Sequence, residues 1–134
     1  FLKTMLTLAL KDPQREIKIV NDQFGSPTWS YRLALQIEKL IESGRNGTYH
    51  ATSEGYCTWY ELATYFLGKM GVPHFFVPCT TAEYPTPAVR PINSILENKR
   101  LKEAGINLMQ VWKSDIDEFV SRFRDRLINE TRRE

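Results

Sequence analysis

The sequence predicts one α/β unit that is mostly helical and carries a few short strands. Three observations support this: apolar residues recur at helical spacing over long stretches, alternating apolar runs are short, and no linker or internal repeat divides the 134 residues. A hydrophobic content of 42% with 25% charged residues is typical of a globular domain. We therefore expect residues 1–134 to share a single, modest core.

The first elements are a helix, a strand and a turn. Apolar residues at helical spacing predict a helix over residues 2–10, which ends before Asp12 and Pro13 because proline disfavours helical geometry in the residue before it. Residues 17–20 alternate as a short strand. Residues 21–28 are rich in the Gly, Ser and Pro of turns, so the chain should change direction there.

A second helix is predicted to begin at Ser30, and its apolar residues share one face that we expect to be buried. These residues are Leu33, Ala34, Ile37, Leu40 and Ile41. Residues 48–52 are typical of a strand. Within it, His50 is interpreted as a structural, hydrogen-bonded histidine, because no neighbouring histidine or carboxylate motif indicates a metal.

A third helix is predicted from Thr58, because Thr58 and Glu61 have the spacing of a capping box. Gly71 and Pro73 should end it. Trp59 is the second residue of this segment, and core packing is a more common role for such a ring than ligand stacking. We therefore expect Trp59 to be buried against the preceding strand.

The last third of the chain begins with a short apolar strand at residues 75–78. Residues 80–91 follow as a proline-rich, ordered loop. A short helix is predicted over residues 98–104, with Gly105 behind it as a left-handed cap. A final amphipathic helix should open at Ser114.

Charge and cysteine content limit the classes of function. The formal net charge of +2, from 18 basic and 16 acidic residues, argues against a nucleic-acid surface, and Asp125, Glu130 and Glu134 interrupt the arginines of the last helix. No apolar run approaches the roughly 20 residues of a membrane span, so we expect a soluble, cytoplasmic protein. Cys57 and Cys79 are interpreted as reduced structural thiols rather than metal ligands.

Four segments appear in an order that resembles a known family. They are VNDQFGSPT at residues 20–28, GTYHA at 47–51, TWYELA at 58–63 and YPTPAVRPINS at 84–94. Together they resemble the dTDP-4-dehydrorhamnose reductases of the extended short-chain dehydrogenase superfamily, essentially from end to end. The resemblance implies the C-terminal substrate-binding lobe of such an enzyme, with the N-terminal Rossmann half absent from these residues.

The resemblance also implies a chemistry. Enzymes of this family use NADPH to reduce dTDP-4-dehydro-L-rhamnose to dTDP-L-rhamnose for cell-surface polysaccharides, and their glycine-rich turn and Tyr-x-x-x-Lys pair lie in the N-terminal half. Tyr65 and Lys69 satisfy the bare spacing here, but they lie one turn apart in a helix outside the family's motif. We therefore expect no catalytic and no NADPH-binding residue in this chain. The pattern at Phe1 and the residues after it is typical of a helix, so we interpret the chain as a fragment of a longer protein. Without the N-terminal half, we expect it to be inactive alone.

Binding a dTDP-sugar requires a cation for the diphosphate, a slot for the base and donors for the sugar. Arg90 is the candidate cation, because a guanidinium can hold two phosphate oxygens at once; the alternative is an ordinary surface arginine. Asn93 is expected either to contact the same ligand or to cap the following helix. The candidates for the base are the residues after the first strand, Gln23, Phe24, Gly25 and Ser26, unless they form only a turn with Phe24 packed inside it.

Two other functions stay open from the sequence. One is a non-catalytic, protein-binding relative such as a regulatory subunit, and the other is an extended dehydrogenase acting on a different nucleotide sugar. The partners that we expect are a dTDP-sugar and the missing Rossmann half, with neither nucleic acid nor a membrane. Apolar surface left open by that missing half would also permit a homo-oligomer. No metal site is predicted.

Overall fold

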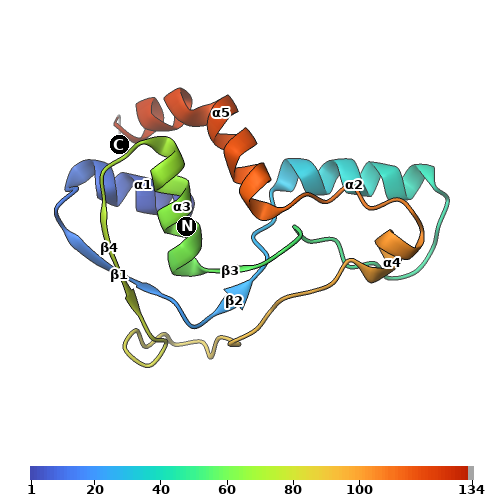
Figure 1. Ribbon diagram of the computed structural model, residues 1–134, viewed down its shortest axis with the longest axis horizontal. Helices are drawn as coiled ribbons and strands as arrows, with labels where there is room; N and C mark the ends of the chain where they lie inside the picture. The colour runs from blue at the N-terminus through green and yellow to red at the C-terminus, as the bar shows by residue number, and fades with distance from the viewer. Residues whose placement is uncertain (133–134) are drawn as a thin grey trace.

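Helices outweigh strands in the computed structural model, which describes residues 1–132 (Figure 1). The elements in chain order are α1 (Leu2–Lys11), β1 (Glu16–Val20), β2 (Phe24–Gly25), α2 (Ser30–Glu42), β3 (Cys57–Thr58), α3 (Trp59–Met70), β4 (Phe75–Cys79), α4 (Lys99–Glu103) and α5 (Trp112–Thr131). This helix-rich unit with few short strands is the predicted fold class. No helix of the described part is long and apolar enough to cross a membrane.

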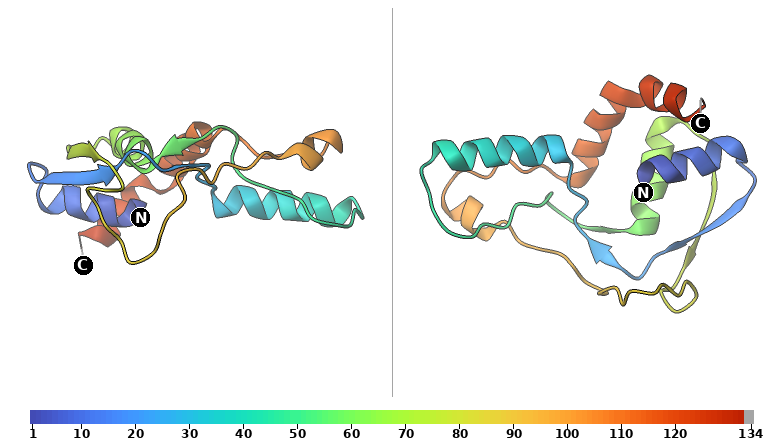
Figure 2. Two further views of the ribbon diagram at one scale, coloured as in Figure 1. Left: turned by 90° about the horizontal axis from the view of Figure 1, so that it is seen from below. Right: turned by 180° about the vertical axis from the view of Figure 1, so that it is seen from behind.

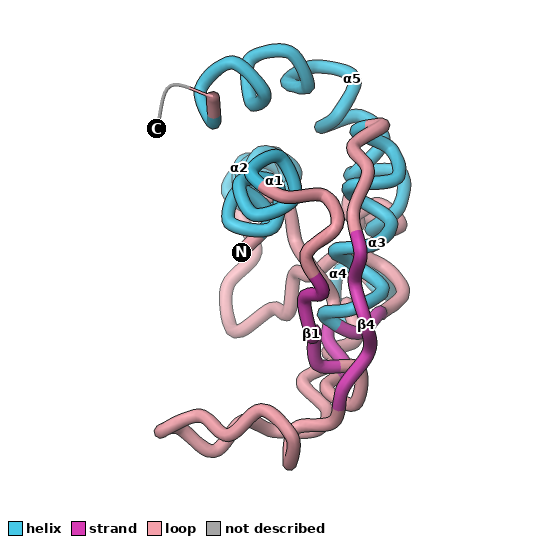
Figure 3. The backbone as a smooth tube through the Cα atoms, turned by 90° about the vertical axis from the view of Figure 1, so that its left-hand side faces the viewer, coloured by secondary structure: helices cyan, strands magenta, loops and turns pink. Residues whose placement is uncertain are grey.

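The strands form two small sheets. β1 pairs in parallel with β4, so that Glu16 lies opposite Phe75 and Val20 opposite Cys79 (Figure 3). β2 pairs antiparallel with β3, where Phe24 lies opposite Thr58. The second pairing matters for function, because it places the turn after β1 beside the start of α3.

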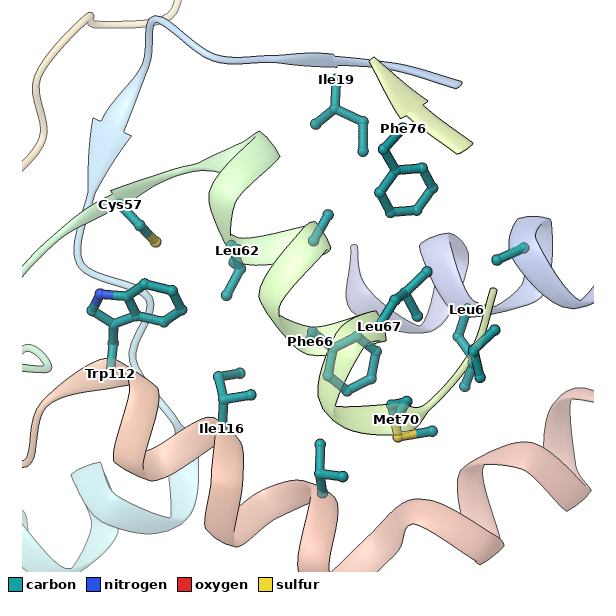
Figure 4. Packing of buried hydrophobic residues seen from close by; sticks show 14 residues of the cluster. Leu6, Ile19, Cys57, Leu62, Phe66, Leu67, Met70, Phe76, Trp112 and Ile116 are labelled. Atoms are coloured by element: carbon teal, nitrogen blue, oxygen red, sulfur yellow. The ribbon is translucent and has the colours of Figure 1, made fainter. Parts of the chain in front are cut away.

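The core lies between α1, α3, α5 and the β1–β4 pair (Figure 4). Leu6, Phe66, Leu67 and Met70 are each at most 1% exposed. Burying side chains of this size is the main stabilising contribution in a small domain, at about 1.5–3 kcal/mol each. The core therefore fixes α3, whose first residues reach the β2–β3 sheet.

The predicted helix ends are mostly confirmed. Thr58 caps α3, since its Oγ1 accepts a 3.1 Å hydrogen bond from the Glu61 amide while the Glu61 carboxylate accepts one from the Thr58 amide. Gly71 follows α3 with φ of 66°, and Gly105 follows α4 with φ of 67°. The last helix begins at Trp112, two positions before the predicted Ser114.

The strand predicted at residues 48–52 is wrong, because this segment takes no strand partner and His50 is exposed. Side chains occupy its backbone groups instead. Arg100 donates a hydrogen bond to the carbonyl of Thr48, and the amide of Thr52 donates to Oδ1 of Asn98 at 2.9 Å. A β-rich composition cannot reveal such side-chain partners.

The burial predicted for α2 is also wrong in part. With α4, this helix lies at one end of the molecule (Figure 2), where Ile37 and Ile41 are 48% and 75% exposed. The fully buried residue of α2 is Gln36, which donates to the Ile106 carbonyl and accepts from the Leu108 amide at 3.0 and 2.7 Å. The cost of burying this polar side chain is therefore offset, because Gln36 forms hydrogen bonds with backbone groups of the chain beside it.

Candidate functional site

A pocket of about 340 Å³ lies where β2, β3, the first turn of α3 and residues 90–94 meet. Five of the six predicted site residues line it: Gln23, Phe24, Gly25, Ser26 and Arg90. Asn93 lines a different hollow, and its Oδ1 accepts a hydrogen bond from the Ile95 amide at 2.8 Å. It caps no helix, and its neighbour Ser94 takes its place in the pocket wall.

Backbone hydrogen bonds hold the two walls of the pocket together. The amide of Phe24 donates to the Ile92 carbonyl at 2.7 Å, and the amide of Ser94 donates to the Phe24 carbonyl at 2.9 Å. Between them, a Cβ on Gly25 would lie 2.9 Å from Oγ of Ser94, which is too close for any larger residue without movement. Glycine therefore permits the contact between the turn after β1 and residues 92–94.

Trp59 lies on the pocket wall and is 43% exposed, so the prediction that it packs in the core is wrong. Its indole Nε1 donates a 3.2 Å hydrogen bond to Oε1 of Gln23. The amide nitrogen of Gln23 in turn donates to Oγ1 of Thr81 at 3.1 Å. β3 leads directly into α3, so the first turn of this helix lies beside the β2–β3 sheet rather than in the core. The Trp59 ring therefore lines the pocket.

Phe24 and Ser26 have different surroundings. Phe24 is 36% exposed, and its ring meets that of Tyr56 edge to face at a centroid distance of 6.2 Å. Part of its ring is therefore free to contact a ligand. The hydroxyl of Ser26 instead donates to the Gly55 carbonyl at 2.7 Å, so its first role is to shape the turn.

Arg90 is an exposed cation at the rim of the pocket. Among the residues that the structure describes, it makes no hydrogen bond and no ion pair. Most other arginines that the structure describes are engaged, as Arg32 is with Asp115 at 3.0 Å. The guanidinium of Arg90 is thus available for an anion.

Sequence reasoning missed two residues beside this pocket. Both carboxylate oxygens of Asp22 accept from the amide of Thr81, at 2.9 and 3.0 Å, and Oδ1 also accepts from its hydroxyl at 2.6 Å. These hydrogen bonds lower the pKa of the Asp22 carboxyl, and the bond from the Thr81 hydroxyl has the largest effect. Asp22 lies inside the first quoted motif, but its partner follows 59 positions later, and no local pattern links the two.

Cys57 forms part of the pocket floor and is only 5% exposed. Burial, with Glu61 nearby, raises the pKa of its thiol to about 12. Burial likewise raises the pKa of Cys79. Both cysteines are free, and they are neutral thiols at physiological pH, which supports a structural role.

Tyr65 and Lys69 lie outside the pocket lining. The Tyr65 hydroxyl donates to Asp117 at 2.9 Å, and Nζ of Lys69 lies 3.1 Å from the same carboxylate. Partial burial and the bond to Asp117 raise the pKa of Tyr65. The pair therefore joins α3 to α5 through Asp117.

The described residues hold no metal cluster, and the chain after β4 offers no free amides to a dinucleotide at Thr80 and Thr81. No group of three or more His, Cys, Asp or Glu side chains in residues 1–132 could hold an ion. Phosphates bind where backbone amides are free at the ends of parallel strands. After β4 these amides are occupied, since Thr80 donates to Glu83 at 2.8 Å and Thr81 to Asp22, and both acceptors are carboxylates that would repel a phosphate. NADPH does not fit this edge.

Comparison with known proteins identifies the family. The model of the RmlD substrate binding domain matches residues 1–125. The chain belongs to this family. In this member of the family, Arg90, Gln23 and Trp59 line the same pocket.

Individual relatives are reductases or biosynthetic proteins. The chain is 37% identical over 120 residues to the spore coat polysaccharide biosynthesis protein SpsK of Bacillus subtilis, covering 90% of this chain and 41% of that protein. It is 39% identical over 126 residues to a dTDP-4-dehydrorhamnose reductase of Burkholderia thailandensis, covering 81% of this chain and 42% of the relative. The first of these relatives is thus named a biosynthetic protein and the second a reductase.

Solved structures agree with this assignment. A dTDP-4-dehydrorhamnose reductase from Clostridium acetobutylicum superposes with a TM-score of 0.87 at 35% identity, covering 92% of this chain and 44% of that chain. Another from Bacillus anthracis, solved in complex with NADP, gives a TM-score of 0.85 at 34% identity, covering 91% of this chain and 43% of that one. The chain thus spans somewhat over two-fifths of the length of these proteins.

Proposed function

We propose that residues 1–134 are the substrate-binding domain of an NADPH-dependent dTDP-4-dehydrorhamnose reductase and that the pocket beside Arg90 holds the dTDP part of the substrate. The substrate would be dTDP-4-dehydro-L-rhamnose, which the enzyme would reduce to dTDP-L-rhamnose. The family and the relatives named above support the enzyme class. The pocket supports the choice of ligand, as follows.

The observation that carries the proposal is an unpaired guanidinium beside exposed aromatic rings. Arg90 can donate two parallel hydrogen bonds to diphosphate oxygens, which are charge-assisted and stronger than neutral ones. Across the pocket, the half-exposed rings of Phe24 and Trp59 can cover a pyrimidine face. Cation and rings in one pocket suit a nucleoside diphosphate better than a free sugar.

Redox chemistry belongs, on this proposal, to protein outside these residues. The strand ends described here do not fit a dinucleotide, and the described residues place no tyrosine and lysine in the pocket. The contribution of this domain is therefore positional, because holding the nucleotide handle turns an encounter between sugar and cofactor into an oriented one. We also propose a cytoplasmic protein, since its cysteines are free thiols.

Titration calorimetry of the purified chain with dTDP tests this function. We expect measurable binding that Arg90→Ala weakens by roughly 10- to 150-fold, the equivalent of about 1.5–3 kcal/mol for hydrogen bonds to a charged group. Arg45→Ala is the matched control, because Arg45 is also exposed but lies outside the pocket lining. Equal affinity of the wild type and Arg90→Ala for dTDP would remove the proposed site.

A further inference from the structure

Arg90 lies on a segment that is fastened to the rest of the molecule mainly at its ends. We name residues 82–91 the Arg90 segment; every residue in it is exposed. Its backbone, yellow in Figure 2, loops away from the helices. Its hydrogen bonds stay local in the described structure, as between Tyr84 and Thr81 and between Thr86 and Ala88. The position of Arg90 therefore depends on what holds each end.

Both ends are held by the same short stretch of chain after β1. At one end, the carboxylate of Asp22 accepts from the amide and hydroxyl of Thr81, at distances from 2.6 to 3.0 Å. At the other, Phe24 exchanges backbone hydrogen bonds with Ile92 and Ser94 at 2.7 and 2.9 Å. The first anchor is made by the Asp22 side chain, so substitution can remove it without touching the backbone. The second anchor adds a 3.1 Å bond from the Ser94 hydroxyl to the Phe24 carbonyl, but its two backbone bonds stay in place when a side chain is changed.

Three prolines make the Arg90 segment a stiff arm rather than a loose loop. They are Pro85, Pro87 and Pro91. Each fixes its own φ and restricts the residue before it, so the segment has fewer backbone conformations than a loop without proline. Thr81 also accepts from the amide nitrogen of Gln23, which bonds Trp59. The Asp22 carboxylate is thus linked through Thr81 to Gln23 and Trp59 in the pocket wall, and through the segment to Arg90.

We propose that Asp22 is a positioning residue, which acts through Thr81 to hold the Arg90 segment so that Arg90 meets the diphosphate. This inference rests on the proposed function of the pocket. It predicts the direction in which the affinity for dTDP changes when the charge of Asp22 is removed. Removing a negative charge near an anionic ligand would by itself strengthen binding, whereas loss of the anchor weakens it.

The test measures dTDP affinity by calorimetry in a double-mutant cycle of Asp22→Asn and Arg90→Ala. Asparagine keeps the size of aspartate, but its NH2 group faces the donors of Thr81 in place of one oxygen. We expect Asp22→Asn to weaken binding about fivefold, the worth of one net hydrogen bond, and to add nothing in the Arg90→Ala background. Hydrogen exchange of residues 82–91 should be faster in Asp22→Asn.

Matched variants guard against a trivial loss of fold. Thr81→Val removes the hydroxyl and keeps the shape of the side chain, so it should weaken dTDP binding as Asp22→Asn does. Thr81→Ser keeps the hydroxyl and should bind dTDP with the wild-type affinity. Glu83→Gln is the control, because Glu83 bonds only locally with Thr80. If Asp22→Asn does not fold by circular dichroism, the Thr81 variants carry the same cycle.

The outcomes separate this inference from the function on which it rests. Unchanged or tighter binding by Asp22→Asn and Thr81→Val, with weaker binding by Arg90→Ala, would overturn the positioning role alone. An equal loss from Asp22→Asn in both backgrounds would do the same, because the effect would then bypass Arg90. Unchanged binding by Arg90→Ala would instead defeat the proposed function.

Discussion

The indole nitrogen of Trp59 and the side-chain oxygen of Gln23 are joined by a hydrogen bond of 3.2 Å across the candidate pocket. This bond ties the first turn of α3, which the core fixes, to the turn that follows β1. The ring also packs against Phe1 at a centroid distance of 4.9 Å, and Trp59 as a whole stays 43% exposed. Trp59 can therefore report on whatever enters the pocket.

Ligand binding should change the fluorescence of Trp59. A base stacked on a half-exposed indole alters its emission, whereas Trp112 is 6% exposed and lies in the core. We expect dTDP to quench the wild-type protein, Trp59→Phe to lose that response, and Trp29→Phe, whose ring packs against Phe119, to keep it. A response that persists in Trp59→Phe would place the ligand elsewhere.

The ion pair between Arg32 and Asp115 should be important for stability. Nε of Arg32 lies 3.0 Å from Oδ1 of Asp115, whose side chain is 3% exposed and whose other oxygen has no partner. Arg32→Leu leaves that charge buried and uncompensated, so chemical denaturation should show a loss of about 3–5 kcal/mol. Arg126→Ala removes an exposed pair with Glu130 and should cost much less, because exposed ion pairs contribute little to stability. Equal losses would contradict this ranking.

Both cysteines should resist alkylation in the folded protein. Cys57 has its pKa raised to about 12 by burial, and Cys79 is shifted in the same direction. Because the thiolate is the reactive form, iodoacetamide near pH 8 should label neither within the time that labels both in guanidinium, as mass spectrometry can follow. Rapid labelling of Cys57 under native conditions would mean that the pocket floor is open.

The anchor of the Arg90 segment should depend on pH in one direction. Hydrogen bonds from Thr81 lower the pKa of Asp22 below 3.8, so their stabilising contribution is complete above that pH and is lost as the pH falls through the lower folded value. An NMR titration of the carboxyl should therefore have its midpoint below 3.8, and Thr81→Val should move it upward. A midpoint above 3.8 would show that the bonds to Thr81 are weak.

Local signals predicted several helix ends well, because these ends have a local physical cause. Proline at residue 13, the capping box of Thr58 and the left-handed Gly71 act within a few residues of the boundary that they set. The turn after β1 could be recognised in the same way, and with it Gln23 and Phe24. These parts of the site were accessible from the sequence.

The remaining parts depend on contacts between distant segments. Gln36 is buried because it bonds the chain some 70 positions later, so the apolar face of α2 gave the wrong orientation. Trp59 was assigned to the core because nothing local indicates that β3 pairs with β2. The bond between Asp22 and Thr81 crosses 59 positions in the same manner. Such partners follow from the tertiary fold rather than from spacing or composition.

The central claim is that dTDP binds between Arg90 and the turn after β1. Adding dTDP to isotopically labelled protein and recording its NMR spectrum tests it most directly. The account predicts that shifts gather on Gln23, Phe24, the Trp59 indole and the Arg90 guanidinium. Shifts confined to the surface around Tyr65, or an unchanged spectrum at saturating dTDP, would contradict it.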